Sequence, residues 1–102
     1  MSAVRPIALL FSLAATLEAA AAAERPAQIG LCMACHQDDG RSGPPGTPRL
    51  AGQDETYLRL AMEAYRSGER KHGPMRAIVG ALQADDIAAL ARWYANQPAC
   101  KP

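Results

Sequence analysis

Two cysteines and a histidine occur together in the stretch LCMACHQDDG, where Cys32 and Cys35 flank two residues and His36 follows at once. Cysteines at this spacing can hold zinc, cycle between a dithiol and a disulfide, or bond covalently to a haem. Each use constrains the fold differently, because a zinc site needs four ligands and a thioredoxin-like dithiol needs a βαβ pattern. The rest of the chain therefore decides between them.

The chain after residue 23 shows helix signals and no strand signals. A helix is expected from Pro26 to the cysteines, because proline is tolerated in a first helical turn. A second is expected from Asp54 and Glu55 to a C-terminal glycine at Gly68, and a third over residues 84–96. Glycines and prolines between His36 and Gln53 predict a long surface loop, and the segment ERKHGPM predicts a second loop before the last helix.

Both longer helices carry apolar residues at helical spacing, so each should turn one face towards a core. These residues are Tyr57, Leu58, Ala61 and Tyr65 in the first of the two, and Ile87, Leu90, Ala91 and Tyr94 in the last helix.

The N-terminal stretch has the pattern of a secretory signal peptide: one arginine, an apolar run from Ile7 to Leu17, and small residues ending at Ala23. The apolar run is well short of the roughly 20 residues that a membrane-spanning helix needs. We therefore expect cleavage of residues 1–23, a mature domain over residues 24–102, no membrane anchor after cleavage, and a periplasmic location.

Composition limits what this domain can be. The formal net charge is +1, with no basic footprint for nucleic acid. A domain this small buries a modest fraction of its surface, so it usually needs an additional stabilising element, such as a disulfide or a bound cofactor. Three cysteines permit at most one disulfide, and a large apolar cofactor would supply the missing interior.

The alternatives to haem lack support elsewhere in the chain. No βαβ pattern is present for a thioredoxin-like dithiol. The remaining candidate zinc ligands are His36, His72 and Cys100, and their spacings are unlike those of common zinc modules. Haem explains the order of the motif, because each thiol adds to a vinyl group and the next residue then lies beneath the iron. Cys32 and Cys35 are thus expected to bind haem, with His36 as the proximal ligand.

The sixth position of the iron needs a donor or stays open. Met75 is the preferred candidate, since it follows Gly73 and Pro74 in an expected loop, whereas Met62 falls mid-helix and suits core packing. His72 is the rival ligand, because imidazole also binds iron well.

The motif CMACH, the segment PRLAGQDETYLRLAMEAYRSGER, Met75 and the final LQADDIAALARWYANQ together resemble a small bacterial class I cytochrome c. The chain is also similar to the haem domains of flavocytochrome c sulfide dehydrogenases. The resemblance implies an all-α fold of three to four short helices around one haem c, attached by two thioethers, with His36 and Met75 as iron ligands.

The resemblance also implies roles for residues outside the motif. The carbonyl of Pro48 should accept a hydrogen bond from the His36 ring, and Leu50 should pack on the haem edge. Tyr57 and Arg49 are candidate partners of the haem propionates. Either Trp93 or Tyr94 should cover the junction of the first and last helices.

Two functions are compatible with these features. The first is an electron carrier between redox proteins, without enzymatic activity. The second is a haem-bearing, non-catalytic subunit of a larger oxidoreductase, for which Cys100 could form a disulfide to a partner or remain free. The basic cluster RSGERKHGPMR is the one candidate docking feature, although charge runs are commonly just solvated.

Overall fold

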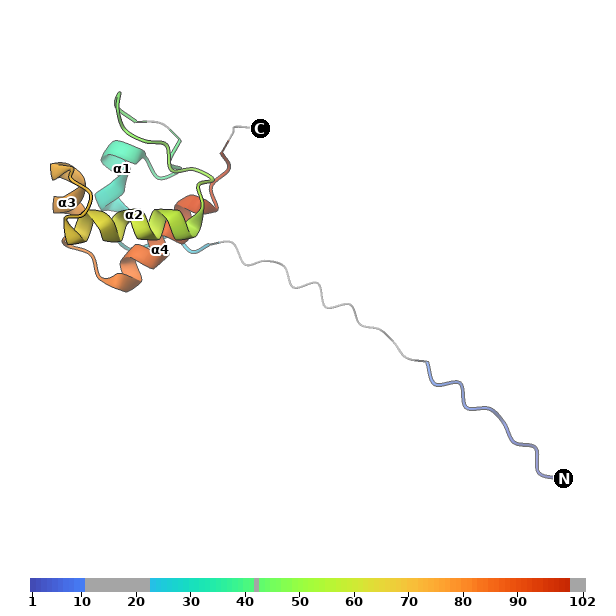
Figure 1. The fold of residues 1–102 in the computed structure, drawn as a ribbon. Coiled ribbons are helices and arrows are strands. Elements are labelled where there is room, and N and C mark those ends of the chain that lie inside the picture. Colours follow the sequence, from blue (N-terminus) through green and yellow to red (C-terminus); the bar gives the residue numbers. More distant parts are fainter. Residues whose placement is uncertain (11–22, 42, 100–102) are drawn as a thin grey trace.

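The computed structural model describes residues 1–10, 23–41 and 43–99, and within these it contains four helices and no strand. They are α1 (Gly30–His36), α2 (Glu55–Ser67), α3 (Gly73–Val79) and α4 (Ala84–Ala95). Figure 1 shows α2 across the middle of the helical body, and it packs against both α3 and α4. The all-α fold expected from the sequence is confirmed.

Helix α2 has the ends that its sequence predicts. Asp54 is the N-cap, and its carboxylate accepts a hydrogen bond of 2.8 Å from the backbone N–H of Tyr57. Gly68 ends the helix at φ 83°, in the left-handed region where a glycine carries no steric cost. The inward face is anchored by Leu58, which is buried.

Helix α4 supplies most of the core. Ile87, Leu90 and Ala91 are fully buried, and Tyr94 is 2% exposed, so the predicted apolar stripe is confirmed. The helix begins where the N–H of Gln83 donates to the Asp86 carboxylate at 2.9 Å.

The first helix starts later than the sequence suggested. Residues 27–29 form a turn, in which the N–H of Ile29 bonds to the carbonyl of Pro26 at 3.2 Å. Helix α1 then begins at Gly30 and continues through both cysteines to His36. The prediction of a helix starting at Pro26 and ending at the cysteines was wrong.

The segment that contains Met75 is helical, which corrects its expected placement in a loop. His72 is the N-cap of α3, and its ring Nδ1 accepts a hydrogen bond from the Met75 N–H at 3.3 Å. Pro74 lies in the first turn, where its missing N–H breaks no helical hydrogen bond. Met75 is therefore held by a helix rather than by a mobile loop.

Two aromatic residues of α4 fasten the chain just after α1. The hydroxyl of Tyr94 donates to the carbonyl of Gln37 at 2.8 Å, and Trp93 Nε1 donates to the carbonyl of Asp38 at 2.6 Å. The backbone also comes close to α4 at Gly40, where a Cβ would lie 2.7 Å from the Tyr94 ring. Both aromatic residues thus tie α4 to the segment that leaves the end of α1.

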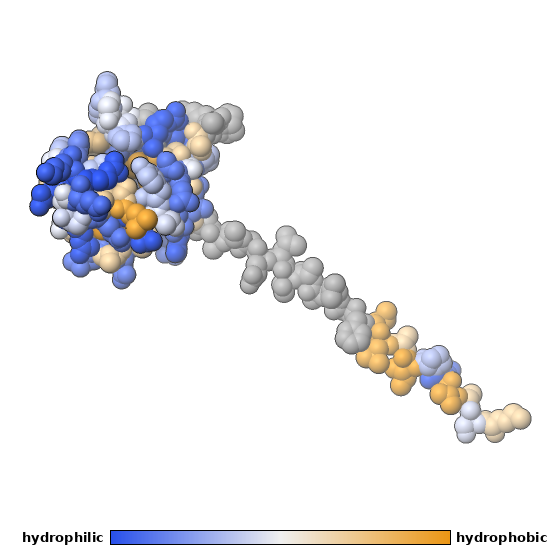
Figure 2. Space-filling model, in the orientation of Figure 1, coloured by the Kyte–Doolittle hydropathy of each residue, from blue (hydrophilic) through white to orange (hydrophobic). Residues whose placement is uncertain are grey.

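Residues 1–10 are exposed and form no regular secondary structure, and their apolar side chains appear in orange in Figure 2. Most of the predicted signal segment falls outside the described residues, and its cleavage stays a prediction. No helix in the described part of the chain combines the length and hydropathy needed to cross a membrane.

Candidate functional site

A cavity of about 750 Å³ opens between the helices and the loop that joins α1 to α2. Its volume falls in the upper part of the range of roughly 300–1,000 Å³ found for cofactor sites. Apolar side chains form much of its wall. They include Leu31, Leu50, Leu58, Met62, Ile78, Val79, Leu82 and Leu90.

Helix α1 brings the sequence motif to this cavity. Cys35 and His36 lie three and four residues after Cys32, so both share a face of α1 with it, and all three line the cavity. Both thiols are free of disulfide bonds; Cys35 is exposed and Cys32 is half-buried. Among the described residues, no three His, Cys, Asp or Glu side chains are grouped so that they could hold a metal ion.

His36 has a fixed orientation. It is 7% exposed, and its ring Nδ1 lies 2.9 Å from the carbonyl oxygen of Pro48. Because a carbonyl can only accept, Nδ1 carries the proton and donates it to Pro48, which leaves the lone pair of Nε2 for a metal. The bond expected between His36 and Pro48 is thus present in the structure.

The protonation of the other groups near α1 follows from burial. Loss of solvent raises the pKa of the Cys32 thiol to about 11, opposed by a hydrogen bond with Tyr94. Burial also raises the pKa of Tyr94, with smaller contributions from Cys32 and Asp38. Both groups are neutral at physiological pH, so the Tyr94 hydroxyl keeps its proton and remains a donor.

The candidate donors for a second axial position all line the same cavity. Met75 reaches it from α3 and Met62 from α2, and both are half-buried against the core. His72 lines the cavity too, but its Nδ1 is engaged as the N-cap of α3. Its ring also contacts Tyr65 edge-on, with the centroids 6.3 Å apart.

The remaining predicted residues also lie on the cavity wall. Leu50 is half-buried and packs against the core, and Tyr57 is 52% exposed. Arg49 lines the cavity as well, but its Nη2 donates to the carbonyl of Ala99 at 3.3 Å.

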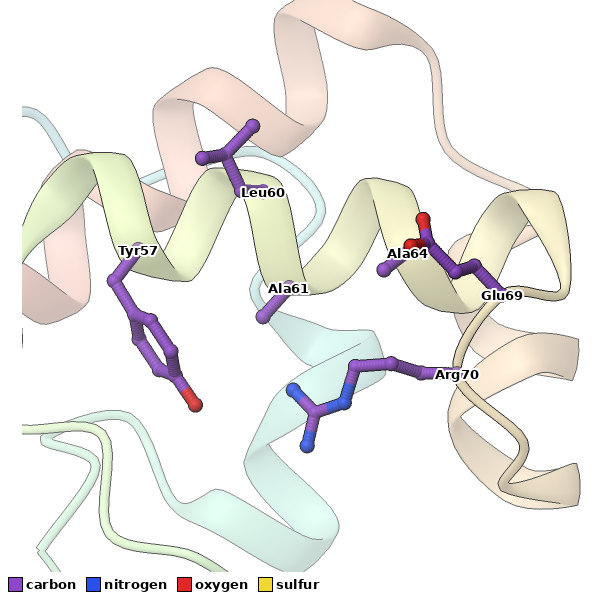
Figure 3. A pocket seen from close by; sticks show the side chains of 6 residues that line it. All are labelled: Tyr57, Leu60, Ala61, Ala64, Glu69 and Arg70. Carbon is purple, nitrogen blue, oxygen red and sulfur yellow. The ribbon is translucent and has the colours of Figure 1, made fainter.

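Sequence reasoning missed Arg70 as a cavity residue. Its guanidinium lies 4.5 Å from the centre of the Tyr65 ring, a cation–π distance. Figure 3 shows Arg70 extending beneath α2 on the same side as the Tyr57 ring. These two residues and Ala61 are shared with a shallower groove of about 430 Å³, so they form the rim where the cavity meets solvent. The sequence signal that could have indicated Arg70 was its position two residues after Gly68, the glycine that ends α2.

The donor set and the shape of the cavity fit a covalently bound haem. Two thiols and an oriented imidazole come from α1, a thioether comes from α3, and the wall between them is apolar. Arg70 and Tyr57 lie at the rim of the cavity, where the carboxylates of a bound haem would reach them. Zinc or a dithiol would leave an apolar cavity of this size unexplained.

Comparison with known proteins gives the same answer. A profile of the cytochrome c family matches residues 20–96. Cytochrome c-554(548) of Halomonas halodenitrificans is 42% identical over 73 residues, which cover 69% of this chain and 88% of the relative. Cytochrome c4 of Pseudomonas aeruginosa is 38% identical over 76 residues, covering 74% of this chain but 38% of the relative.

A third relative is the thiosulfate dehydrogenase electron acceptor of Thiomonas intermedia, 35% identical over 82 residues, covering 78% of this chain and 38% of that protein. Among solved structures, cytochrome c4 of Acidithiobacillus ferrooxidans matches with a TM-score of 0.60 and 29% identity, covering 64% of this chain and 37% of the other. The chain thus spans well under half of several longer relatives and most of the shorter one. It belongs to the cytochrome c family.

Proposed function

We propose that this chain is a periplasmic electron carrier with one haem c, attached through thioethers to Cys32 and Cys35 and ligated by His36 and Met75. Its family implies covalently bound haem c and electron transfer without enzymatic activity. The observation that carries the finer assignment is the single cavity that all four side chains line. The N-terminal signal pattern supports export, which haem attachment in bacteria requires.

The residues around the iron would favour the ferrous state. A thioether is a weaker donor to ferric iron than an imidazole, so a methionine ligand raises the reduction potential relative to a second histidine. The apolar wall, to which Leu50 contributes, keeps water away and disfavours the extra charge of ferric haem. The Pro48 carbonyl opposes this in part, because a hydrogen bond to Nδ1 makes His36 a stronger donor.

The haem carboxylates are assigned to the rim. Arg70 and Tyr57 have donor groups there, and no carboxylate of the described residues pairs with Arg70. Arg49, whose guanidinium donates to Ala99, is the weaker candidate for this role.

The ligand assignment is tested by Met75→Ala. The oxidised wild-type protein is expected to show the far-red charge-transfer band of ferric Met-ligated haem, and the variant to lack it. The reduced variant should bind carbon monoxide readily, because its sixth position is open. Met62→Leu serves as the matched control and should keep the band. A Met75→Ala protein with an unchanged spectrum would remove Met75 from the iron and leave His72 or Met62 as the candidate.

A second candidate function is a haem-bearing electron-transfer subunit of a larger oxidoreductase, such as a flavocytochrome c sulfide dehydrogenase. It is favoured by relatives named thiosulfate dehydrogenase electron acceptor in Thiomonas intermedia and Stutzerimonas stutzeri. Native purification separates the two functions, because a carrier elutes alone and a subunit elutes with its partner. Reducing and nonreducing electrophoresis would then show whether Cys100, which lies outside the described residues, forms a link.

A further inference from the structure

The loop that presents the Pro48 carbonyl is closed at its base by a hydrogen bond. The backbone N–H of Leu50 donates to the carbonyl of Gly40 at 2.8 Å. The chain between these two residues is here called the proximal loop, and its described residues are 41 and 43–49. The base of the loop is thus fixed, while the part that carries Pro48 projects from it.

Packing does little to hold the proximal loop in place. Residues 43–46 and Pro48 are exposed, and Thr47 is half-buried. Segments that bury little surface open locally at a low cost in free energy unless other contacts restrain them. The hydrogen bond of 2.9 Å between the His36 ring and the Pro48 carbonyl therefore needs a further restraint on the loop.

The C-terminal segment supplies a restraint at each end of the loop. Arg41 Nε donates to the carbonyl of Pro98 at 2.8 Å, and Arg49 Nη2 donates to the carbonyl of Ala99 at 3.3 Å. Hydrogen bonds from a guanidinium are charge-assisted and stronger than those between neutral groups. Figure 1 shows the last described residues, in red, beside the green loop. The two arginines thus join the loop to residues 57 and 50 positions further along the chain.

The C-terminal segment is itself anchored to the helical body. The side chain of Gln97 donates to the carbonyl of Trp93 at 3.2 Å. A Cβ on Gly52, at φ 70°, would lie 2.8 Å from the Cβ of Ala99, so the segment can lie this close only against a glycine. The carbonyls of Pro98 and Ala99 are therefore acceptors that the body holds in place.

The two arginines act on the loop in different ways. The Pro48 carbonyl and the Arg49 nitrogen belong to one planar peptide unit, so a movement of Arg49 turns the carbonyl. Arg41 restrains the other end of the loop, and it is not among the described residues that line the cavity. A contact with a haem carboxylate therefore does not explain the position of Arg41.

We propose that residues 98–99 form a clasp that holds the Pro48 carbonyl on the ring of His36. Arg41 and Arg49 are the positioning residues of this clasp, because they act on the iron through that carbonyl. The proposal rests on the haem assignment above. Release of the clasp weakens the hydrogen bond to Nδ1, which makes His36 a poorer donor to ferric iron and raises the reduction potential.

The clasp is tested with two truncated forms of the haem-loaded protein. One ends at Gln97 and lacks both acceptor carbonyls, and the other ends at Ala99 and keeps them. Exchange of the His36 Nδ1 proton with solvent, followed by NMR spectroscopy of the ferrous protein, should be several-fold faster in the first and unchanged in the second. The reduction potential should rise only in the first. Exchange at the wild-type rate in the chain that ends at Gln97 would overturn the proposal.

A core amide separates release of the clasp from general destabilisation. Leu90 is fully buried in α4, so its backbone N–H exchanges only when the core opens. Its exchange rate should stay the same in both truncated chains. A parallel acceleration at Leu90 and at His36 Nδ1 would mean that the whole domain had loosened, and would also overturn the proposal.

Arg41 gives an independent test. Arg41→Met removes the donor and should accelerate Nδ1 exchange several-fold in the full chain, but add little in the chain that ends at Gln97, where the acceptor is already missing. Arg66→Met removes the same charge from the exposed end of α2 and is the matched control, with an unchanged rate. Additive effects of Arg41→Met and the truncation would contradict the clasp. The haem absorbance and the far-red band of the wild-type protein report separately on the haem assignment, so failure of either proposal is recognisable.

Discussion

His36 and the candidate ligand Met75 are positioned by hydrogen bonds of different kinds. The Pro48 carbonyl, which belongs to the loop after α1, holds the His36 ring at 2.9 Å. The His72 ring, by contrast, accepts the backbone N–H of Met75 and so starts the helix on which that thioether stands. His72, the other candidate for the iron ligand, thus has a structural role as the N-cap of α3.

Substitution of His72 should separate its capping role from iron ligation. His72→Ala removes the acceptor and should cost about 0.5–2 kcal/mol of stability, with a weaker far-red band because the first turn of α3 frays. His72→Asn restores a capping oxygen and should recover both the thermal midpoint and the band. A wild-type spectrum without the far-red band, together with carbon monoxide binding gained in both His72 variants but not in Met75→Ala, would identify His72 as the iron ligand.

At the scale of elements, the capped helix α2 carries much of the cavity wall. Asp54→Ala removes the side chain that accepts the Tyr57 N–H, and should lower the free energy of unfolding by about 1 kcal/mol. Asp54→Asn keeps the acceptor and should lose far less. Guanidinium denaturation followed by far-ultraviolet circular dichroism measures both variants, and equal losses would show that the contribution of Asp54 comes from its charge rather than from the cap.

Helices with conventional ends could be predicted from the sequence. Asp54 and Gly68 delimit α2 as expected, and the stripe of α4 is buried as its spacing indicates. Helix α3 was missed because Gly73 and Pro74 are typical loop residues, whereas here they occupy a first turn that histidine caps. The start of α1 was misplaced because proline is compatible with a turn as well as with a helix.

The candidate site was predictable where covalent chemistry fixes the spacing. Cys32, Cys35 and His36 lie together on α1 because their order places them on one helical face. Arg70 was not predictable in the same way. Its direction depends on the left-handed turn at Gly68 and on the Tyr65 ring, and helical periodicity does not extend past that turn.

The whole molecule has a small interior arranged around the cavity. Among the residues that the structure describes, the buried core contains eight apolar residues, and several of them, including Leu58, Val79 and Leu90, also line the cavity. These side chains can contact both the core and a bound haem. The cofactor would therefore act as part of the core as well as the redox centre.

Loss of Cys32 and Cys35, the proposed attachment thiols, should accordingly unfold the protein. Cys32→Ala with Cys35→Ala is expected to abolish cooperative thermal unfolding, measured by far-ultraviolet circular dichroism, because an unfilled apolar cavity destabilises a domain of this size. Met75→Ala keeps the covalent haem and should still unfold cooperatively at a lower temperature. A cooperative transition in the haem-free double variant would show that the polypeptide core suffices.

The loop after α1 touches that helix closely at one position. A side chain at Gly43 would collide with the backbone carbonyl of Cys35, so the loop lies against the helix only because nothing projects there. The same loop presents the Pro48 carbonyl to His36. Evolution is therefore expected to keep glycine at position 43 while the neighbouring turn varies, because a larger residue there would displace the Pro48 carbonyl from His36.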